Sequence, residues 1–176
     1  MTIQPDDKDW TWVIERQCPE CGFDAGATDA RDVSAMLREA TADWAAVLTT
    51  RADVRDRPSP DVWSPLEYGC HVRDVFEVYE GRLGRMLNED GPHYENWDQD
   101  ETALASNYSA QDPLVVAAEV ETLGNNLADL FDTVIGEQWD RDGYRSDGAA
   151  FTIDTFARYF IHDIVHHLVD VGARPR

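Results

Sequence analysis

Four long segments of the chain repeat apolar side chains at intervals of three and four residues, the spacing that places them on one face of a helix. No segment shows a convincing two-residue alternation of the kind that marks a half-buried strand. The pattern therefore predicts an all-α fold, and the number of segments predicts a four-helix bundle. The predicted helices cover 28–48, 64–88, 112–134 and 153–171.

The start of the second helix carries the clearest local signal. Ser64 is the expected N-cap, Pro65 lies in the first turn, and Glu67 follows the cap by three residues. The connection 89–111 is long and rich in Asp, Asn and Gly, and long connections in compact domains are often functional. The predicted organisation is an N-terminal extension, 1–27, followed by the bundle, 28–176.

The formal net charge of −20 restricts the partners that this chain can have. Nucleic acids and anionic membranes need Lys and Arg to neutralise phosphate, so neither is an expected partner. The first nine residues lack the basic and apolar regions of a signal peptide, and no run approaches the length of a membrane span. Three cysteines do not make a disulfide framework. We therefore predict a cytoplasmic protein.

Three histidines fall on helix faces that should point inward. His162 and His166 stand four residues apart on the last helix, so both imidazoles can reach one point beside it. His71 lies on the apolar face of the second helix. Three neutral imidazoles with one coordination position left open are the ligand set of a catalytic zinc-type site. The alternative is that each is a core histidine with a hydrogen-bond partner.

Other residues near these histidines are predicted to be their neighbours and not metal ligands. His167 is turned by about 100° from His166 and is expected to pair with Asp163 or to meet solvent. Asp170 and Asp74 are candidates to fix the imidazole tautomers, although exposed surface acids would look the same in sequence.

A metal-bound thiol suits such a site chemically. Little of a free thiol is thiolate near neutral pH, and coordination to a cation deprotonates it. A three-histidine site with an open position could hold the thiolate and present it to an electrophile in the same pocket.

Three stretches of the sequence resemble the DinB-like superfamily, in the expected order over about 28–171. They are Trp63-Ser64-Pro65-Leu66-Glu67-Tyr68-Gly69-Cys70-His71, Asn96-Trp97-Asp98-Gln99-Asp100, and the closing His162-Asp163-x-x-His166-His167. The similarity is to the actinobacterial branch of mycothiol-dependent S-transferases and maleylpyruvate isomerases. Lys8 is the single lysine among many arginines, which is typical of high-GC bacteria.

The resemblance implies a bundle with an up-down-down-up arrangement and a metal triad of His71, His162 and His166. It also implies a divalent metal, with Zn²⁺ expected, and mycothiol as the thiol co-substrate. The predicted function is a metal-dependent thiol S-transferase that conjugates mycothiol to electrophilic small molecules, a detoxification activity. The alternatives are a mycothiol-dependent maleylpyruvate-type isomerase and a non-catalytic bundle that binds a metal or a small ligand. The sequence leaves a homodimer open.

Two further motifs are less specific. Trp97, Asp98 and Gln99 are predicted to bind the thiol, Trp97 by stacking and the other two through sugar hydroxyls, with an aromatic plug for the loop as the alternative. Cys18-Pro19-Glu20-Cys21 could be half of a second metal site, a redox pair, or a turn that docks the extension on the bundle. We favour a structural role.

Overall fold

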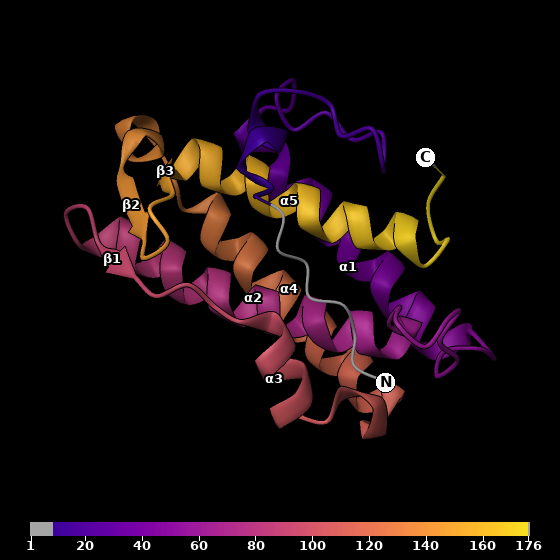
Figure 1. Cartoon of the computed structure of the whole chain (residues 1–176). Helices are drawn as coiled ribbons and strands as arrows, with labels where there is room; N and C mark the ends of the chain where they lie inside the picture. The colour runs from indigo at the N-terminus through magenta and orange to yellow at the C-terminus, as the bar shows by residue number, and fades with distance from the viewer. Residues whose placement is uncertain (1–8, 176) are drawn as a thin grey trace.

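The computed structural model describes residues 9–175, and four long helices make up most of it. They are α1 (Val33–Thr50), α2 (Pro65–Asn88), α4 (Pro113–Asp132) and α5 (Ile153–Asp170), and they assemble into a bundle (Figure 1). The predicted four-helix bundle is confirmed. Within the described range, no helix combines the length and the apolar character needed to cross a membrane.

Helices α2 and α4 begin where the sequence signals place them. The Ser64 hydroxyl accepts a hydrogen bond from the Glu67 backbone N–H, and the Glu67 carboxylate accepts one from the Ser64 N–H at 2.9 Å. This capping box satisfies two donors that the first turn of a helix leaves without partners. Asp112 caps α4 by accepting from the N–H of Leu114. Before α1, Ala30–Asp32 form a 3-10 turn, so the regular helix begins a few residues later than predicted.

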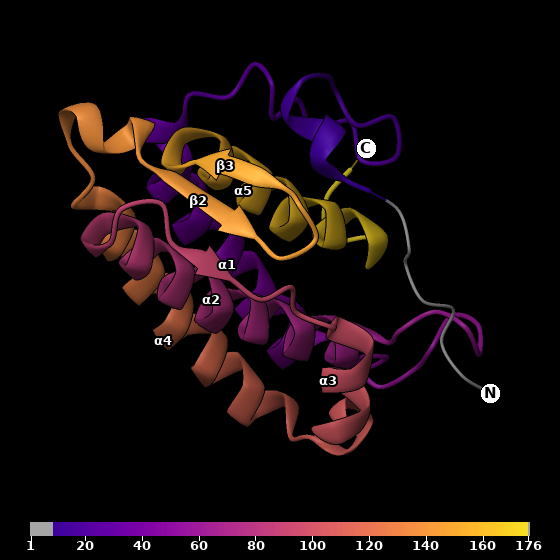
Figure 2. The same cartoon turned by 60° about the vertical axis from the view of Figure 1, so that its left-hand side comes forward.

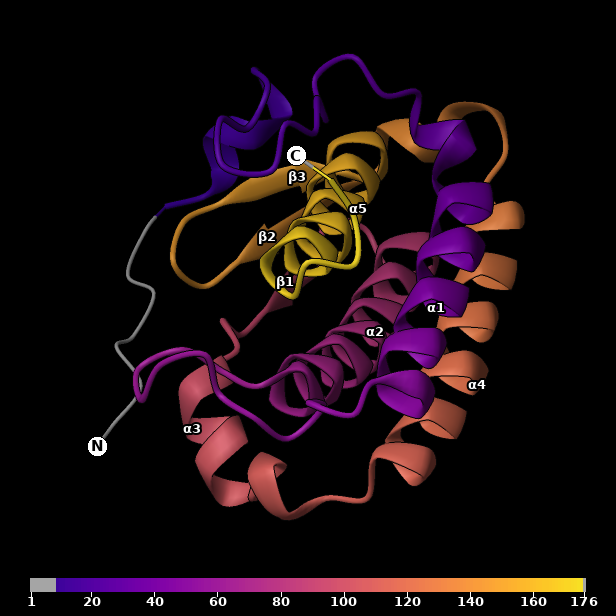
Figure 3. The ribbon, with the colours of Figure 1, turned by 90° about the vertical axis from the view of Figure 1, so that its right-hand side faces the viewer.

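In the core, α4 packs against α1 and α2. Helix α5 packs against α1 on the side of α1 that faces away from α4 (Figure 3). Gly124 on α4 allows the closest approach, because a Cβ there would lie 2.3 Å from Thr41 Oγ1 and 2.9 Å from Phe76 Cε2. Trp44 on α1 is fully buried, and its indole N–H donates to the carbonyl of Ile164 on α5 at 3.3 Å. The contacts of Gly124 and Trp44 thus join all four long helices.

A small sheet, which the sequence analysis did not predict, covers one end of the bundle (Figure 2). It consists of β1 (His93–Tyr94), β2 (Asp142–Arg145) and β3 (Ala150–Thr152). β1 pairs parallel with β2, with His93 opposite Tyr144, and β2 pairs antiparallel with β3. Strands of two to four residues are too short to show an alternating pattern, which needs about four to eight residues.

The connection between α2 and α4 contains a helix, α3 (Gln99–Ala105), in place of the expected unstructured loop. Asp98 caps it by accepting from the N–H of Glu101 at 2.9 Å. No residue of α3 is buried, so the helix has no apolar stripe by which the sequence could have shown it. It lies beside the start of α2 (Figure 1).

The N-terminal segment, residues 9–27, lies along α5 on the side opposite α2 (Figure 3). It is anchored by fully buried Val13, Cys18 and Ala25. The Arg158 guanidinium on α5 donates to the carbonyls of Ile14 and Ala25, both at 3.3 Å. The predicted division into 1–27 and 28–176 stays a prediction, and its first eight residues lie outside the described range.

Candidate functional site

A cleft of about 1320 Å³ opens beside α5, and all the histidines except His93 line it. Its walls come from the N-terminal segment, the loop before α2, the start of α3 and the turn between β2 and β3. Helices α2 and α5 contribute the potential metal ligands, which are His71, His162, Asp163, His166 and His167. These ligands, with two cysteines of the N-terminal segment, form two separate sets.

The first set joins α2 to α5 and is called here the open set: His71, Asp163 and His167. Nε2 of His71 lies 3.6 Å from Oδ2 of Asp163, and Nε2 of His167 lies 3.5 Å from Oδ1 of the same carboxylate. Asp163 and His167 share a face of α5 because they stand four residues apart. His71 meets them from α2. Three ligands are thereby brought together in the lining of the cleft.

The spacing of the open set fits a divalent ion. Ligand atoms held about 2.0–2.1 Å from a tetrahedral ion lie roughly 3.4 Å from one another. The two measured separations are close to this value and longer than hydrogen bonds of about 2.7–3.2 Å. Both ring nitrogens of His71 are buried and lack a hydrogen-bond partner among the described residues. An ion in the open set would supply a partner to one of them.

The electrostatics of the open set also favour a cation. Burial lowers the pKa of His71, which keeps it in the neutral form that binds metals. Burial would likewise lower the pKa of His167, but the charges and hydrogen bonds of Asp163 and Asp170 raise it to about 10. Burial opposes ionisation of Asp163, yet His167 and His71 hold the pKa of its carboxyl well below the usual range. A metal ion would replace the proton on His167 as the positive charge beside Asp163.

Asp170 orients His167 toward the rest of the open set. Its Oδ2 lies 2.8 Å from Nδ1 of His167, so an N–H at Nδ1 can donate to the carboxylate. Nε2, which faces Asp163, then carries the lone pair that binds metals. The other predicted partner, Asp74, accepts from the Tyr108 hydroxyl at 2.5 Å and pairs with Arg73 at 2.7 Å.

The second set, called here the closed set, contains Cys18, Cys21, His162 and His166. All four residues are buried, and both cysteines are free thiols. Cys18 Sγ lies 3.7 Å from Nδ1 of His166, and Nε2 of His162 has no hydrogen-bond partner among the described residues. Burial lowers the pKa of His162 to about 4 and raises that of Cys21 to about 12.

The described residues do not gather the predicted triad of His71, His162 and His166 into one set. His162 and His166 turn toward the N-terminal segment, and His71 meets the residues one position further along α5. One residue along a helix is a rotation of about 100°, which selects a different neighbour. The i,i+4 spacing of Asp163 and His167 was visible in the sequence, but it also suits an ordinary surface pair. The joint role of the three histidines as metal ligands stays a prediction.

The three residues predicted to bind a thiol all line the cleft. The Trp97 indole stacks on the His71 imidazole, with 5.5 Å between ring centroids and 11° between the planes. Asp98 caps α3 and Gln99 is its first residue. Their place in the lining of the cleft is compatible with ligand binding, and their role in binding a thiol stays a prediction.

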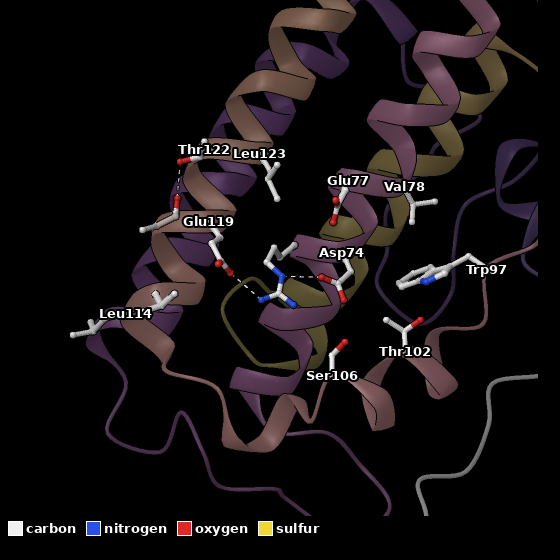
Figure 4. Close-up of a pocket in the computed structure, with 13 residues that line it drawn as sticks. Asp74, Glu77, Val78, Trp97, Thr102, Ser106, Leu114, Glu119, Thr122 and Leu123 are labelled. Carbon is white, nitrogen blue, oxygen red and sulfur yellow. Dashed lines mark hydrogen bonds and ion pairs between the residues drawn. The ribbon is translucent and has the colours of Figure 1, made fainter.

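A second hollow of about 1020 Å³ lies between α2, α3 and α4 (Figure 4). Arg73 lines it and pairs with Asp74 and Glu119. Trp97 borders both this hollow and the cleft, so the indole stands between them. None of the described residues that line the second hollow is a His or Cys, which leaves the cleft as the candidate functional site.

Comparison with known proteins agrees with this architecture. Residues 35–170 match the family model described as the DinB superfamily. Among solved structures, the chain is similar to YfiT from Bacillus subtilis, described as a probable metal-dependent hydrolase with an unusual four-helix bundle topology. The identity is 16%, the TM-score is 0.69, and the alignment covers 97% of this chain and 92% of that one. At this identity the likeness shows the fold alone. No curated protein matches the chain.

Proposed function

The chain belongs to the DinB superfamily, and we propose that it is a metal-dependent enzyme whose ion is held by the open set of His71, Asp163 and His167. One observation carries the proposal: buried His71, with neither ring nitrogen bonded among the described residues, lies beside two further ligands in a cleft. A divalent ion bound there would lower the pKa of a thiol or water molecule.

The side chains around the open set have separable roles. Asp163 would supply negative charge to a bound ion, and Asp170 holds the ring of His167 so that Nε2 faces Asp163. Trp97 covers one face of the His71 ring and excludes water from it. These contacts fix the ligands before any substrate arrives, which lowers the cost of ordering them.

Within this class, we propose thiol S-transfer with mycothiol as the thiol. The thiol loses its proton, its sulfur bonds to an electrophilic carbon, and a leaving group departs with its electron pair. Three protein ligands would leave one coordination position open for a thiol. The polar side chains of Asn96, Asp98 and Gln99 line the same cleft and suit the hydroxyl groups of a sugar-bearing thiol. The resemblance of the chain to mycothiol-dependent enzymes supports this choice.

Metal-dependent hydrolysis is the second candidate. With Asp163 in place of a third histidine, the open set combines two imidazoles with one carboxylate, a set used by zinc hydrolases. The fold likeness to YfiT points the same way, through the hydrolase activity ascribed to that protein. Water would then take the place of the thiol as the nucleophile.

Arg82 bears on the substrate class and on the isomerase alternative. Its guanidinium lines the cleft, donates to the Glu95 carbonyl at 2.8 Å and lies 4.8 Å from the centre of the Tyr94 ring. Among the described residues, the groups whose charges act on it are tyrosines and Arg145, with no carboxylate among them. A buried cation in this position would favour a substrate with an anionic group, such as a diacid.

The test is product formation from a chromogenic electrophile by zinc-loaded protein, with and without mycothiol. We expect thiol-dependent conjugation by the wild type and by His93→Ala, a control that alters an exposed histidine outside the cleft. We expect its loss in His71→Ala and Asp163→Asn. Full activity in both variants would refute the open set as the active centre. Turnover of an ester at a rate independent of thiol would favour hydrolysis.

A further inference from the structure

The proposed function does not use the closed set, although the closed set has four potential ligands and the open set has three. We propose that Cys18, Cys21, His162 and His166 form a second metal site, a four-coordinate zinc-type centre that fastens the N-terminal segment to α5. The two sets share no residue, so this proposal stands or falls independently of the enzyme activity.

The donors and their spacing are those of a structural zinc site. Two thiolates and two imidazoles are a common tetrahedral set, and four protein ligands leave no position for substrate. Cys18 and Cys21 are separated by two residues, and His162 and His166 by three. Both spacings fall within the ranges of known structural sites.

The backbone around the cysteines has the shape of a metal-binding turn. The Gly22 N–H donates to the Cys18 carbonyl at 2.8 Å, and the Cys18 N–H donates to the Phe23 carbonyl at 2.8 Å. Gly22 has φ 75°, a left-handed conformation that glycine adopts without a Cβ clash. This tight turn brings both sulfur atoms to the same side, toward α5.

The geometry of the four ligand atoms also fits an ion. Each lies within 4.8 Å of the other three, and Cys18 Sγ is 3.7 Å from Nδ1 of His166. A sulfur about 2.3 Å and a nitrogen about 2.0–2.1 Å from a tetrahedral ion lie roughly 3.5 Å apart. The His162 side chain is buried, with 4% of the residue exposed, and its Nε2 has no hydrogen-bond partner among the described residues. An ion would satisfy that nitrogen.

The position of the closed set gives the metal a structural role with a consequence for the cleft. The Trp10 ring lies 5.8 Å from the His162 ring and 5.2 Å from the His166 ring, and Trp10 lines the cleft. A metal at the closed set would therefore hold in place one part of the cleft wall, which includes Trp10, His162 and His166. Binding releases one proton from each thiol, since the thiolate is the ligand form.

The experiment measures zinc by elemental analysis and then replaces zinc with Co²⁺, whose thiolate complexes absorb in the near ultraviolet. For wild type we expect two metal ions per chain and thiolate-to-cobalt absorption. The Cys18→Ser/Cys21→Ser double variant should keep one ion and lose that absorption. Cys70→Ser, which removes the buried thiol outside both sets, should keep both ions and the absorption. His71→Ala should lose one ion and keep the absorption.

Three results would overturn the proposal. The first is cobalt-loaded wild type without thiolate absorption, a readout that needs no variant and is unaffected by misfolding. The second is retention of both ions by the double variant. If Cys18 and Cys21 instead form a disulfide in protein purified without reductant, with zinc absent from the closed set, the pair is a redox pair and the proposal is wrong. If the wild-type protein holds both ions but does not conjugate the thiol, the result would count against the proposed function and leave the second metal site standing.

Discussion

The indole of Trp97 lies flat against the imidazole of His71, at 5.5 Å between ring centroids and 11° between ring planes. His71 comes from α2, and Trp97 comes from the connection just before α3. The connection that the sequence marks as functional thus reaches a candidate metal ligand directly. The Trp97 indole covers the His71 imidazole, and the same indole borders both the cleft and the second hollow.

Replacing Trp97 with Ala should weaken the activity without removing the metal. The uncovered His71 ring loses its stacking partner and becomes accessible to water, but its nitrogens keep their position on α2. We expect kcat/KM for conjugation to fall by at least tenfold, with zinc content unchanged and Trp97→Phe partly restoring the rate. Steady-state kinetics and elemental analysis check this. Unchanged kinetics in Trp97→Ala would show that the indole only fills space.

Replacing Asp170 with Asn should weaken metal binding at the open set. The Asp170 carboxylate accepts from Nδ1 of His167, and loss of such a partner typically reduces metal affinity by about 10–100-fold. Competition with a chelator of known affinity measures the change. The control is Asp142→Asn, which alters an exposed carboxylate on β2. Equal zinc affinity in Asp170→Asn and the wild type would contradict the assigned role of Asp170.

Gly124→Ala should destabilise the fold, because the added methyl group would lie 2.3 Å from Thr41 Oγ1 and must push α4 away from α1. Overpacking of this kind costs about 1–3 kcal/mol in the free energy of unfolding. Gly84→Ala is the matched control within α2. Its Cβ meets nothing within 4 Å, so it should gain about 0.5–1 kcal/mol from helix propensity. Urea unfolding of both variants tests the contrast.

Glu67 should make the stability depend on pH in the acid range. Burial would raise the pKa of its carboxyl, but hydrogen bonds from Arg57 and Ser64 outweigh burial and hold it below the ordinary value of 4.5. A carboxylate with a depressed pKa stabilises the fold above the unfolded-state value, and this contribution is lost as the pH falls through the folded-state pKa. Glu67→Gln should therefore lower the free energy of unfolding at pH 7 by about 1.5–3 kcal/mol.

The difference between wild type and Glu67→Gln should shrink as the pH is lowered below 4.5. Denaturant unfolding of both proteins at pH 7 and at pH 4 and below measures it. The measured quantity is the difference in the free energy of unfolding between the two proteins. Titration of the metal ligands changes both free energies alike, so it does not contribute to this difference. A gap that stays constant down to the lowest pH would mean that the Glu67 carboxyl is not held ionised by its neighbours.

The parts of the fold that the sequence predicted are those with local causes. The capping box of Ser64 and Glu67 and the apolar faces of the long helices lie within a few turns of chain, and they identify all four long helices, with α1 beginning later than predicted. Helix α3 and the three strands were missed. α3 buries no side chain, and the strands are held by pairing partners up to about 50 residues away, such as His93 and Tyr144.

The sequence by itself predicted that His71, His162 and His166 face inward, and it singled out Trp97, Asp98 and Gln99 as candidate binding residues. In the structure all six line one cleft. Only the tertiary structure decided which residues share a set. A helix presents His162 and His166 on one face and Asp163 and His167 on the next, and helical spacing alone cannot say which face meets α2. That choice depends on the rotation of α5, which is set by long-range packing against α1, α2 and the N-terminal segment. It puts Asp163 and His167 beside His71, and His162 and His166 beside the two cysteines.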